Sequence, residues 1–299
     1  MQLNKVGVVG AGTSGKGIIR TLAGAGLNVV FCEQSDELVQ KAMHELDDQL
    51  EVEISKWGVT AGEKRLILSR IEGTSDRRKL AGSQIVIEAT AGDLQDRQKI
   101  FEELDALFPK DAVLLSNCAT ICISEIARKT KHPERIAGMH FTIPVHLRPV
   151  VEIVRGRYTS DKAMEQVRQL AKIAKKKPIE VLEMPGLITM RVMVPYINEA
   201  MHIAMEGLVG ADEVDEAVKL AFKLPAGPLA MADRIGLDTL LKDMERLFTT
   251  LGLLQYRPCP ILRRMVRMGY LGVKSGRGFY RYDEHGRNMG CASKNLFVD

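Results

Sequence analysis

Residues 5–15 read Lys5-Val6-Gly7-Val8-Val9-Gly10-Ala11-Gly12-Thr13-Ser14-Gly15. An apolar strand precedes three glycines in the spacing GxGxxG, and a helical pattern opens at the third. The first glycine permits a tight turn, the second lets backbone approach a pyrophosphate, and the third lets helix pack on strand. Free N–H groups at the helix N-terminus favour a phosphate there. The stretch therefore predicts a dinucleotide site with contacts from Gly10, Gly12, Thr13, Ser14 and Gly15.

A second apolar run strengthens this interpretation. The segment Asn28–Cys32 has strand character and ends at Glu33, about 20 residues after the glycines, where a ribose-binding acid belongs. The carboxylate of Glu33 would accept hydrogen bonds from a 2′-hydroxyl and repel a 2′-phosphate. We therefore expect NAD rather than NADP as the cofactor.

The same glycines also come close to the pattern of a second phosphate-binding motif. Gly10, Gly15 and Lys16 have the spacing of a phosphate-binding P-loop. That motif needs Ser or Thr after the lysine to hold Mg²⁺, whereas Gly17 stands there. A P-loop also has no use for Glu33, so dinucleotide binding is favoured.

Short β-rich runs alternate with helical patterns through residues 1–184. Such alternation predicts an α/β, Rossmann-type, doubly wound and mostly parallel sheet with helices on both faces. The predicted strands are Lys5–Val9, Asn28–Cys32, Ile85–Ala89, Ala112–Ser116, Ile136–His140, Val150–Val154 and Pro178–Leu182. The predicted helices are Gly15–Ala25, Asp36–Ser55, Gln95–Phe108 and Ser124–Lys129.

The pattern changes at Met184-Pro185-Gly186, where we place a domain boundary. Residues 185–299 are expected to form an all-helical C-terminal domain for substrate binding and dimerisation. Pro195 should kink its first helix, because proline lacks an N–H and clashes with the preceding turn. The predicted helices are Leu187–Glu206, Val214–Leu220, Pro228–Ile235, Leu237–Thr250 and Pro260–Met268.

Composition narrows the class of protein. The net charge of +4 is mildly basic, no nucleic-acid motif is present, and an aromatic share of 5% is low for base stacking. No apolar run reaches the roughly 18 residues of a membrane span, and no export signal is expected at the N-terminus. The five cysteines lack a second ligand pair at metal spacing, so no metal site is expected. We expect a cytoplasmic protein with reduced thiols.

Later motifs resemble one enzyme family. Gly138-Met139-His140-Phe141 with Pro144, followed by Val150-Val151-Glu152-Ile153, is similar to the GMHFFNP…LVE signature of the L-3-hydroxyacyl-CoA dehydrogenases. The blocks 198–200, 227–238 and 269–280 resemble the same family. The similarity runs from the first strand to about Tyr282, which is nearly the whole chain.

The resemblance implies an NAD-dependent oxidoreductase acting on a small-molecule substrate, an acyl-CoA, and working as a homodimer. His140 would take the proton of the 3-hydroxyl while hydride leaves C3 for the nicotinamide, and Glu152 would orient the imidazole. Asn117 would be a polar neighbour of the reaction and of the cofactor. Further cofactor contacts implied by family position are Ala89, Arg97 and Lys274, with Arg97 in place of a lysine.

The chain departs from the family pattern at several positions. In Asn117-Cys118-Ala119-Thr120, the methyl of Ala119 replaces the hydroxyl that usually binds the substrate oxygen. Ile143 and Met190 stand where the family has asparagines, and Gly92 stands where it has a glutamate. Ala119, Ile143 and Met190 are nevertheless expected to line the substrate pocket, with Lys56 as a contact of a coenzyme phosphate.

Three functions follow from these matches and departures. The favoured one is a 3-hydroxyacyl-CoA dehydrogenase. The second is a dehydrogenase of the same fold that acts on a hydroxy compound without coenzyme A. The third is an NAD-binding protein without catalysis, because losing one preorganised donor typically costs about 10²–10³ in kcat.

Overall fold

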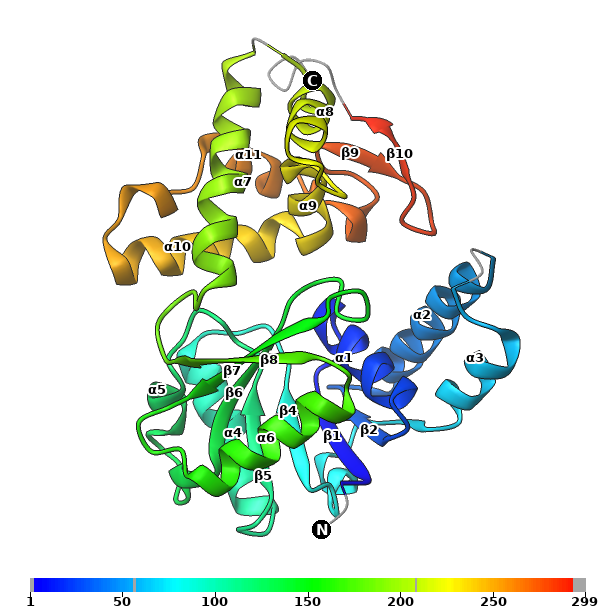
Figure 1. Ribbon diagram of the computed structural model, residues 1–299, viewed down its shortest axis with the longest axis vertical. Coiled ribbons are helices and arrows are strands. Elements are labelled where there is room, and N and C mark those ends of the chain that lie inside the picture. The colour runs from blue at the N-terminus through cyan, green and yellow to red at the C-terminus, as the bar shows by residue number, and fades with distance from the viewer. Residues whose placement is uncertain (1–2, 56–57, 208, 293–299) are drawn as a thin grey trace. The chain divides into compact units, whose positions relative to one another are not determined.

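The computed structural model describes residues 3–55, 58–207 and 209–292. The chain divides into two compact units, Met1–Leu187 and Ile188–Asp299. The first unit contains the sheet and the second is built mainly of helices (Figure 1). No helix within the described ranges is long and apolar enough to cross a membrane.

The first unit is organised around one eight-stranded sheet with the order β3-β2-β1-β4-β5-β6-β7-β8. Its pairs are parallel except β6 with β7, which is antiparallel. The order turns outward from β1 in both directions, so this is the doubly wound, mostly parallel sheet that the alternating pattern predicts. The strands are β1 Lys5–Val9, β2 Asn28–Cys32, β3 Ile71–Thr74, β4 Ile85–Glu88, β5 Val113–Ser116, β6 Ile136–Phe141, β7 Val150–Arg155 and β8 Lys177–Leu182.

Helices cover both faces of this sheet (Figure 1). The buried residues of α1 and α6 share one core cluster with the strands. The helices α4 and α5 pack against each other, and their buried Phe101 and Ile126 lie outside that cluster. The helices are α1 Thr13–Gly24, α2 Asp36–Ser55, α3 Ala61–Leu68, α4 Leu94–Leu107, α5 Ile123–Ala127 and α6 Asp161–Ile173.

Three elements of this unit, namely β3, α3 and α6, were missing from the sequence prediction. Strand β3 pairs with β2 but contains Glu72 and Gly73, which weaken a β-rich pattern. Helix α3 has no fully buried residue, so its apolar stripe is faint. Its start is nevertheless marked by a capping box, in which Thr60 accepts from Glu63 N and Glu63 accepts from Thr60 N.

The second unit carries five helices within the described residues, together with a small hairpin. Strands β9 Tyr280–Tyr282 and β10 Asn288–Cys291 pair antiparallel, an addition that the prediction of an all-helical domain did not contain. The helices are α7 Thr189–Glu206, α8 Ala211–Phe222, α9 Pro228–Ile235, α10 Leu237–Leu251 and α11 Pro260–Arg267.

Helix α7 runs through Pro195 as one continuous helix. A proline at this position removes the N–H that would bond the carbonyl of Arg191, four residues earlier. The hydroxyl of Tyr256, whose side chain is buried, donates to that carbonyl at 3.3 Å. The segment after α10 thus supplies the donor that the helix itself lacks.

Two buried aspartates link separate segments of the second unit by accepting hydrogen bonds. Asp215 of α8 accepts from the backbone N–H groups of Leu229 and Ala230 at 2.8 Å each, at the first turn of α9. Asp233 of α9 accepts from Phe279 N and Tyr280 N at 3.0 Å each. The block of glycines and aromatics near residue 278 is therefore held by carboxylates from two helices.

Candidate active site

The glycine-rich turn forms an anion cradle at the start of α1. Gly10 has φ +92°, and a Cβ on Gly15 would lie 2.0 Å from the carbonyl oxygen of Gly10, so both positions require glycine. A Cβ on Gly12 would meet nothing within 4 Å, which means that open space lies in front of the turn. Gly12 caps α1 without a side chain, and the first turn has no acidic residue. The N–H groups of Thr13 and Ser14 are thus suited to a pyrophosphate.

Glu33 lies at the end of β2, beside this cradle. Its Oε1 accepts from Ala11 N at 2.5 Å, and its Oε2 accepts from Gln34 N at 3.3 Å. The carboxylate therefore sits at the glycine turn, as a ribose-binding acid must. The residues present fit a dinucleotide.

Lys16 argues further against the P-loop alternative. Its ammonium forms an ion pair with Glu45 of α2. Burial lowers the pKa of Lys16, with a further contribution from the neighbouring Lys41. This lysine is therefore already engaged across two helices.

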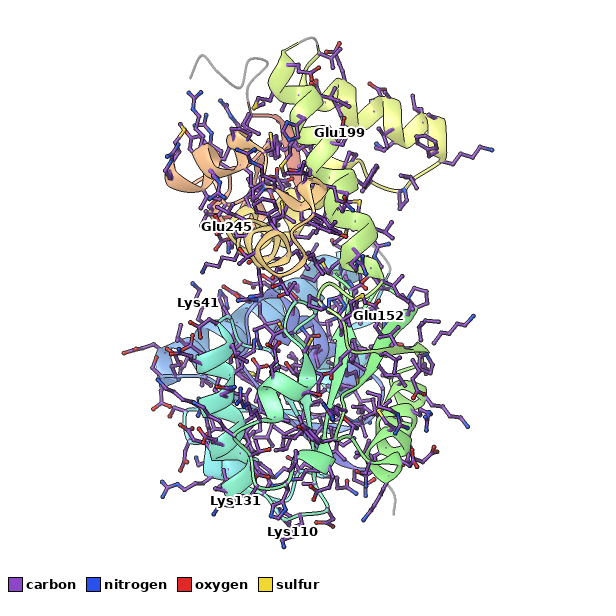
Figure 2. All side chains as sticks on the ribbon, turned by 90° about the vertical axis from the view of Figure 1, so that its left-hand side faces the viewer. Lys41, Lys110, Lys131, Glu152, Glu199 and Glu245 are labelled. Carbon is purple, nitrogen blue, oxygen red and sulfur yellow. The ribbon has the colours of Figure 1, made fainter. Side chains whose placement is uncertain are left out.

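His140 and Glu152 lie directly opposite each other on β6 and β7. Nδ1 of His140 is 2.8 Å from Oε2 of Glu152, and the carboxylate is buried (Figure 2 labels Glu152). If Nδ1 carries the proton, it donates to the carboxylate and Nε2 is the basic nitrogen. Among the described residues Nε2 has no hydrogen-bond partner, so the pair forms an oriented base.

Asn117 connects this pair to the neighbouring strand. It follows β5, its backbone N–H donates to Glu88 O at 2.9 Å, and its Oδ1 accepts from Phe141 N at 3.0 Å. Phe141 is the residue after His140, so the amide of Asn117 fixes the end of β6. Within the described part of the chain its Nδ2 group has no partner and remains available for a ligand.

A buried ion pair that sequence reasoning missed lies beside Asn117. Glu88, fully buried at the end of β4, pairs with Arg97 of α4. The carboxylate also accepts from Ser116 Oγ at 3.0 Å and Thr90 N at 2.8 Å. Arg97 donates in addition to Thr90 O at 2.9 Å. The guanidinium predicted to touch the cofactor thus also bonds the loop between β4 and α4, which contains Ala89.

Two hydroxyls near Ala119 in the sequence, those of Ser116 and Thr120, are candidates to replace the one absent at Ala119. Ala119 is buried, and its carbonyl accepts from Gly186 N at 2.7 Å. Ser116 Oγ bonds Glu88, and Thr120 Oγ1 lies 3.7 Å from the Cys118 sulfur. Both candidate replacements are buried and engaged elsewhere, so the hydroxyl lost at Ala119 is not restored from its neighbours.

The remaining predicted site residues belong to different segments of the chain. Ile143 lies in the loop after β6 and is partly buried. Met190 and Lys274 belong to the second unit, where Met190 is buried on α7 and Lys274 pairs with Asp238 at 2.5 Å. Lys56 lies outside the described residues.

The cysteines form no metal centre in the described ranges. No group of three His, Cys, Asp or Glu side chains there could hold a metal ion. All five cysteines are free thiols. Burial raises the pKa of Cys122 to about 11, with help from the carboxylate of Glu125, so this thiol is far from the thiolate form that binds metals.

Comparison with known proteins places this geometry in a family. Residues 5–184 match the model of the 3-hydroxyacyl-CoA dehydrogenase NAD binding domain, and residues 186–282 match that of the 3-hydroxyacyl-CoA dehydrogenase C-terminal domain. The chain belongs to the 3-hydroxyacyl-CoA dehydrogenase family. The expectations of that family, of an α/β Rossmann-type fold and of NAD as the cofactor are confirmed.

Individual members of the family align over nearly the full length. A probable 3-hydroxybutyryl-CoA dehydrogenase of Bacillus subtilis (strain 168) is 40% identical, covering 95% of this chain and 99% of its own. The structure of (S)-3-hydroxybutyryl-CoA dehydrogenase PaaH1 from Ralstonia eutropha is 41% identical, with TM-score 0.80, covering 95% of this chain and 100% of its own. FadB2 from M. tuberculosis is 36% identical with TM-score 0.87, at the same coverage.

Proposed function

We propose that this chain catalyses the NAD-dependent interconversion of a 3-hydroxyacyl-CoA and a 3-ketoacyl-CoA. The observation that carries the proposal is the His140–Glu152 pair, with Nδ1 of the imidazole 2.8 Å from the carboxylate and Nε2 without a partner among the described residues. This arrangement suits removal of a hydroxyl proton by a histidine whose tautomer is fixed. NAD, when bound, supplies the acceptor for the hydride.

In the proposed mechanism, Nε2 of His140 takes the proton from the 3-hydroxyl as the C3–H bond breaks. The buried carboxylate of Glu152 then stabilises the imidazolium, because the two charges face each other away from water. Asn117 holds the strand end that carries the histidine and offers its amide to a ligand. In the reverse direction the imidazolium returns the proton to the ketone oxygen.

The test is NADH oxidation by the purified protein with acetoacetyl-CoA, followed by the absorbance of NADH. Typical enzymes turn over at about 1–10³ s⁻¹. Turnover in that range supports the proposal. If NADH binds but acetoacetyl-CoA is not reduced, the proposed function is wrong. Calorimetric titration of NADH in parallel separates failure of catalysis from failure of cofactor binding.

A second candidate is a dehydrogenase for a hydroxy compound without coenzyme A. The observation that favours it is the methyl at Ala119 in place of a hydroxyl, together with the engagement of the Ser116 and Thr120 hydroxyls by other groups. Reduction of free keto compounds, with acetoacetyl-CoA left unreduced, would select this candidate. Tight NADH binding without turnover on either class would select an NAD-binding role.

We further propose that the protein is a cytoplasmic homodimer whose contact lies on the second unit. Three large apolar side chains at the end of α8 and just beyond it are solvent-exposed, namely Leu220, Phe222 and Leu224. Exposed apolar clusters of this kind mark interfaces. Light scattering of the wild type and Phe222→Glu tests the dimer, because a charge there should shift the mass toward that of a monomer.

A further inference from the structure

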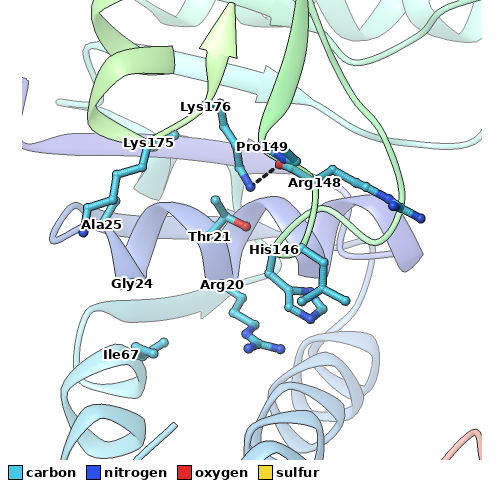
Figure 3. Close-up of a pocket in the computed structure, with 12 residues that line it drawn as sticks. Arg20, Thr21, Gly24, Ala25, Ile67, His146, Arg148, Pro149, Lys175 and Lys176 are labelled. Carbon is cyan, nitrogen blue, oxygen red and sulfur yellow. Dashed lines mark hydrogen bonds between the residues drawn. The ribbon is translucent and has the colours of Figure 1, made fainter. Parts of the chain in front are cut away.

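A second cavity lies in the first unit, away from the glycine turn. It has a volume of about 350 Å³ and is bounded by α1, α3, the loop after β6 and the junction of α6 with β8 (Figure 3). None of Gly10 to Gly15 lines it. Its lining contains Arg20, Arg148, Lys175 and Lys176, together with His146, and among the described residues it contains no acidic side chain.

Lys176 is the first indication of what this cavity binds. The residue is 7% exposed, and its Nζ donates to Val145 O at 2.7 Å and Arg148 O at 2.6 Å. In the described part of the chain no carboxylate lies within 4.0 Å of this ammonium. Burial lowers the pKa of Lys176, and no acid acts against that shift. Buried charges are normally paired, so the missing partner points to an anion.

Arg20 adds a second cation that is also buried. Its guanidinium pairs with Glu53 of α2, and the same carboxylate lies 3.0 Å from Nε2 of His146. The carboxylate of Glu53 therefore bonds both Arg20 and His146, and burial, with a contribution from Arg20, lowers the pKa of His146. This carboxylate neutralises neither Lys176 nor Lys175, so the cavity keeps an excess of positive charge.

Lys175 adds a third cation, and its backbone has a conformation that lysine rarely adopts. It follows α6 with φ 55°, the left-handed region in which a Cβ crowds the next carbonyl and glycine is usual. Its side chain extends along the end of α1 toward Ala25 (Figure 3). Lys175 therefore adopts a backbone conformation that is disfavoured for lysine, and its side chain lines the cavity.

Small and apolar side chains form the rest of the lining. Gly24 and Ala25 leave space beside α1, and Ile67 and Pro149 supply apolar surface. A volume of about 350 Å³ is at the lower end of small-molecule sites and exceeds what a bare inorganic anion fills. We propose that this cavity binds the phosphate group of an organic phosphate, with Lys175, Lys176 and Arg20 facing the phosphate.

The experiment titrates adenosine 3′,5′-bisphosphate into NADH-saturated protein by calorimetry, because NADH blocks the glycine turn. Wild type is compared with Lys175→Gln and with Lys172→Gln, a matched control on an exposed lysine of α6 outside the lining. We expect affinity to fall at least about tenfold in Lys175→Gln and to stay unchanged in the control. No binding by the wild type, or equal affinity in all three proteins, overturns the proposal.

The source of the phosphate is distinguished by kinetics. One source is the phosphate end of an acyl-CoA, which rests on the proposed function; the other is a free phosphorylated metabolite. A raised KM of Lys175→Gln for acetoacetyl-CoA, with an unchanged KM for acetoacetyl-pantetheine, assigns the cavity to the substrate. Unchanged KM for both, with bisphosphate binding lost, assigns it to a free metabolite. If the wild type reduces neither thioester, the proposed function fails and calorimetry alone decides the cavity.

Discussion

Two carboxylates, one in each unit, are buried to the same extent but have different kinds of hydrogen-bond partner. Glu152 and Asp233 are each 1% exposed. Glu152 faces the imidazole of His140, which can gain and lose a proton. Asp233 faces two backbone N–H groups and the hydroxyl of Tyr282 at 3.1 Å, which keep their protons at neutral pH. We infer that the partner of a buried acid, rather than its burial, distinguishes the proposed catalytic role of Glu152 from the structural role of Asp233.

The largest expected effect is loss of the histidine. His140→Ala should lower kcat by about 10²–10⁴-fold, the usual contribution of a positioned proton-transfer group. NADH affinity should stay unchanged, because His140 lies outside the glycine turn. Steady-state kinetics with acetoacetyl-CoA and NADH titration measure both quantities. His44→Ala, on the exposed surface of α2, is the control. A kcat within threefold of wild type would remove His140 from the mechanism.

The next effect comes from the partner of the histidine. Glu152→Gln keeps the size of the side chain and removes its charge, so it should lower kcat by about 10²-fold, the lower end of that range. KM and the melting temperature should change little. A protein that unfolds early but keeps its kcat would show that Glu152 resembles Asp233, and the comparison above would fail.

The sequence predicts the parts of this site that depend on local pattern. The GxGxxG turn and Glu33 at a strand end follow from short apolar runs and their flanking residues, whereas His140 and Glu152 are chosen by resemblance to the family motif and only their placement on successive strands follows from the apolar runs. The fold class follows in the same way from the alternation of strands and helices. These features need no knowledge of how distant segments meet.

The parts that could not be predicted depend on long-range packing. The Glu88–Arg97 pair needs β4 and α4 to be docked, and no spacing rule distinguishes Arg97 from an arginine in solvent. The bond from Ser116 to Glu88 likewise depends on the packing of β5 beside β4, so it is visible only in the fold. The hairpin of β9 and β10 is short and rich in polar residues, so it gives no clear period.

A smaller effect should appear as pH dependence of stability. Burial raises the pKa of Asp233 to about 7, against the hydrogen bonds from Tyr280 N, Phe279 N and Tyr282 that favour the charged form. Between about pH 4 and 7 the folded state then holds a proton that the unfolded state releases. The free energy of unfolding should therefore fall as pH rises through this window, by about 1.4 kcal/mol per pH unit for one proton.

Asp233→Asn isolates this contribution. Urea unfolding at several pH values gives the difference in unfolding free energy between wild type and variant, and Asp215, whose pKa burial also raises, is present in both proteins. The advantage of the wild type should shrink from pH 5 to pH 7 and then level off. An advantage that grows with pH would mean that the three donors outweigh burial and that Asp233 is charged in the fold.

The smallest effect concerns a carbonyl rather than a carboxylate. Tyr256→Phe removes the hydroxyl that donates to Arg191 O, and should lower the free energy of unfolding by about 1 kcal/mol, the typical net value of one hydrogen bond. Urea unfolding measures it, and kcat per folded molecule should not change. The variant Pro195→Ala tests whether the proline makes this hydrogen bond necessary, because alanine restores the helical N–H that the Arg191 carbonyl lacks. Tyr256→Phe should therefore cost less in the Pro195→Ala background than in the wild type. Equal costs in both backgrounds would mean that the Tyr256 hydroxyl does not compensate for the proline.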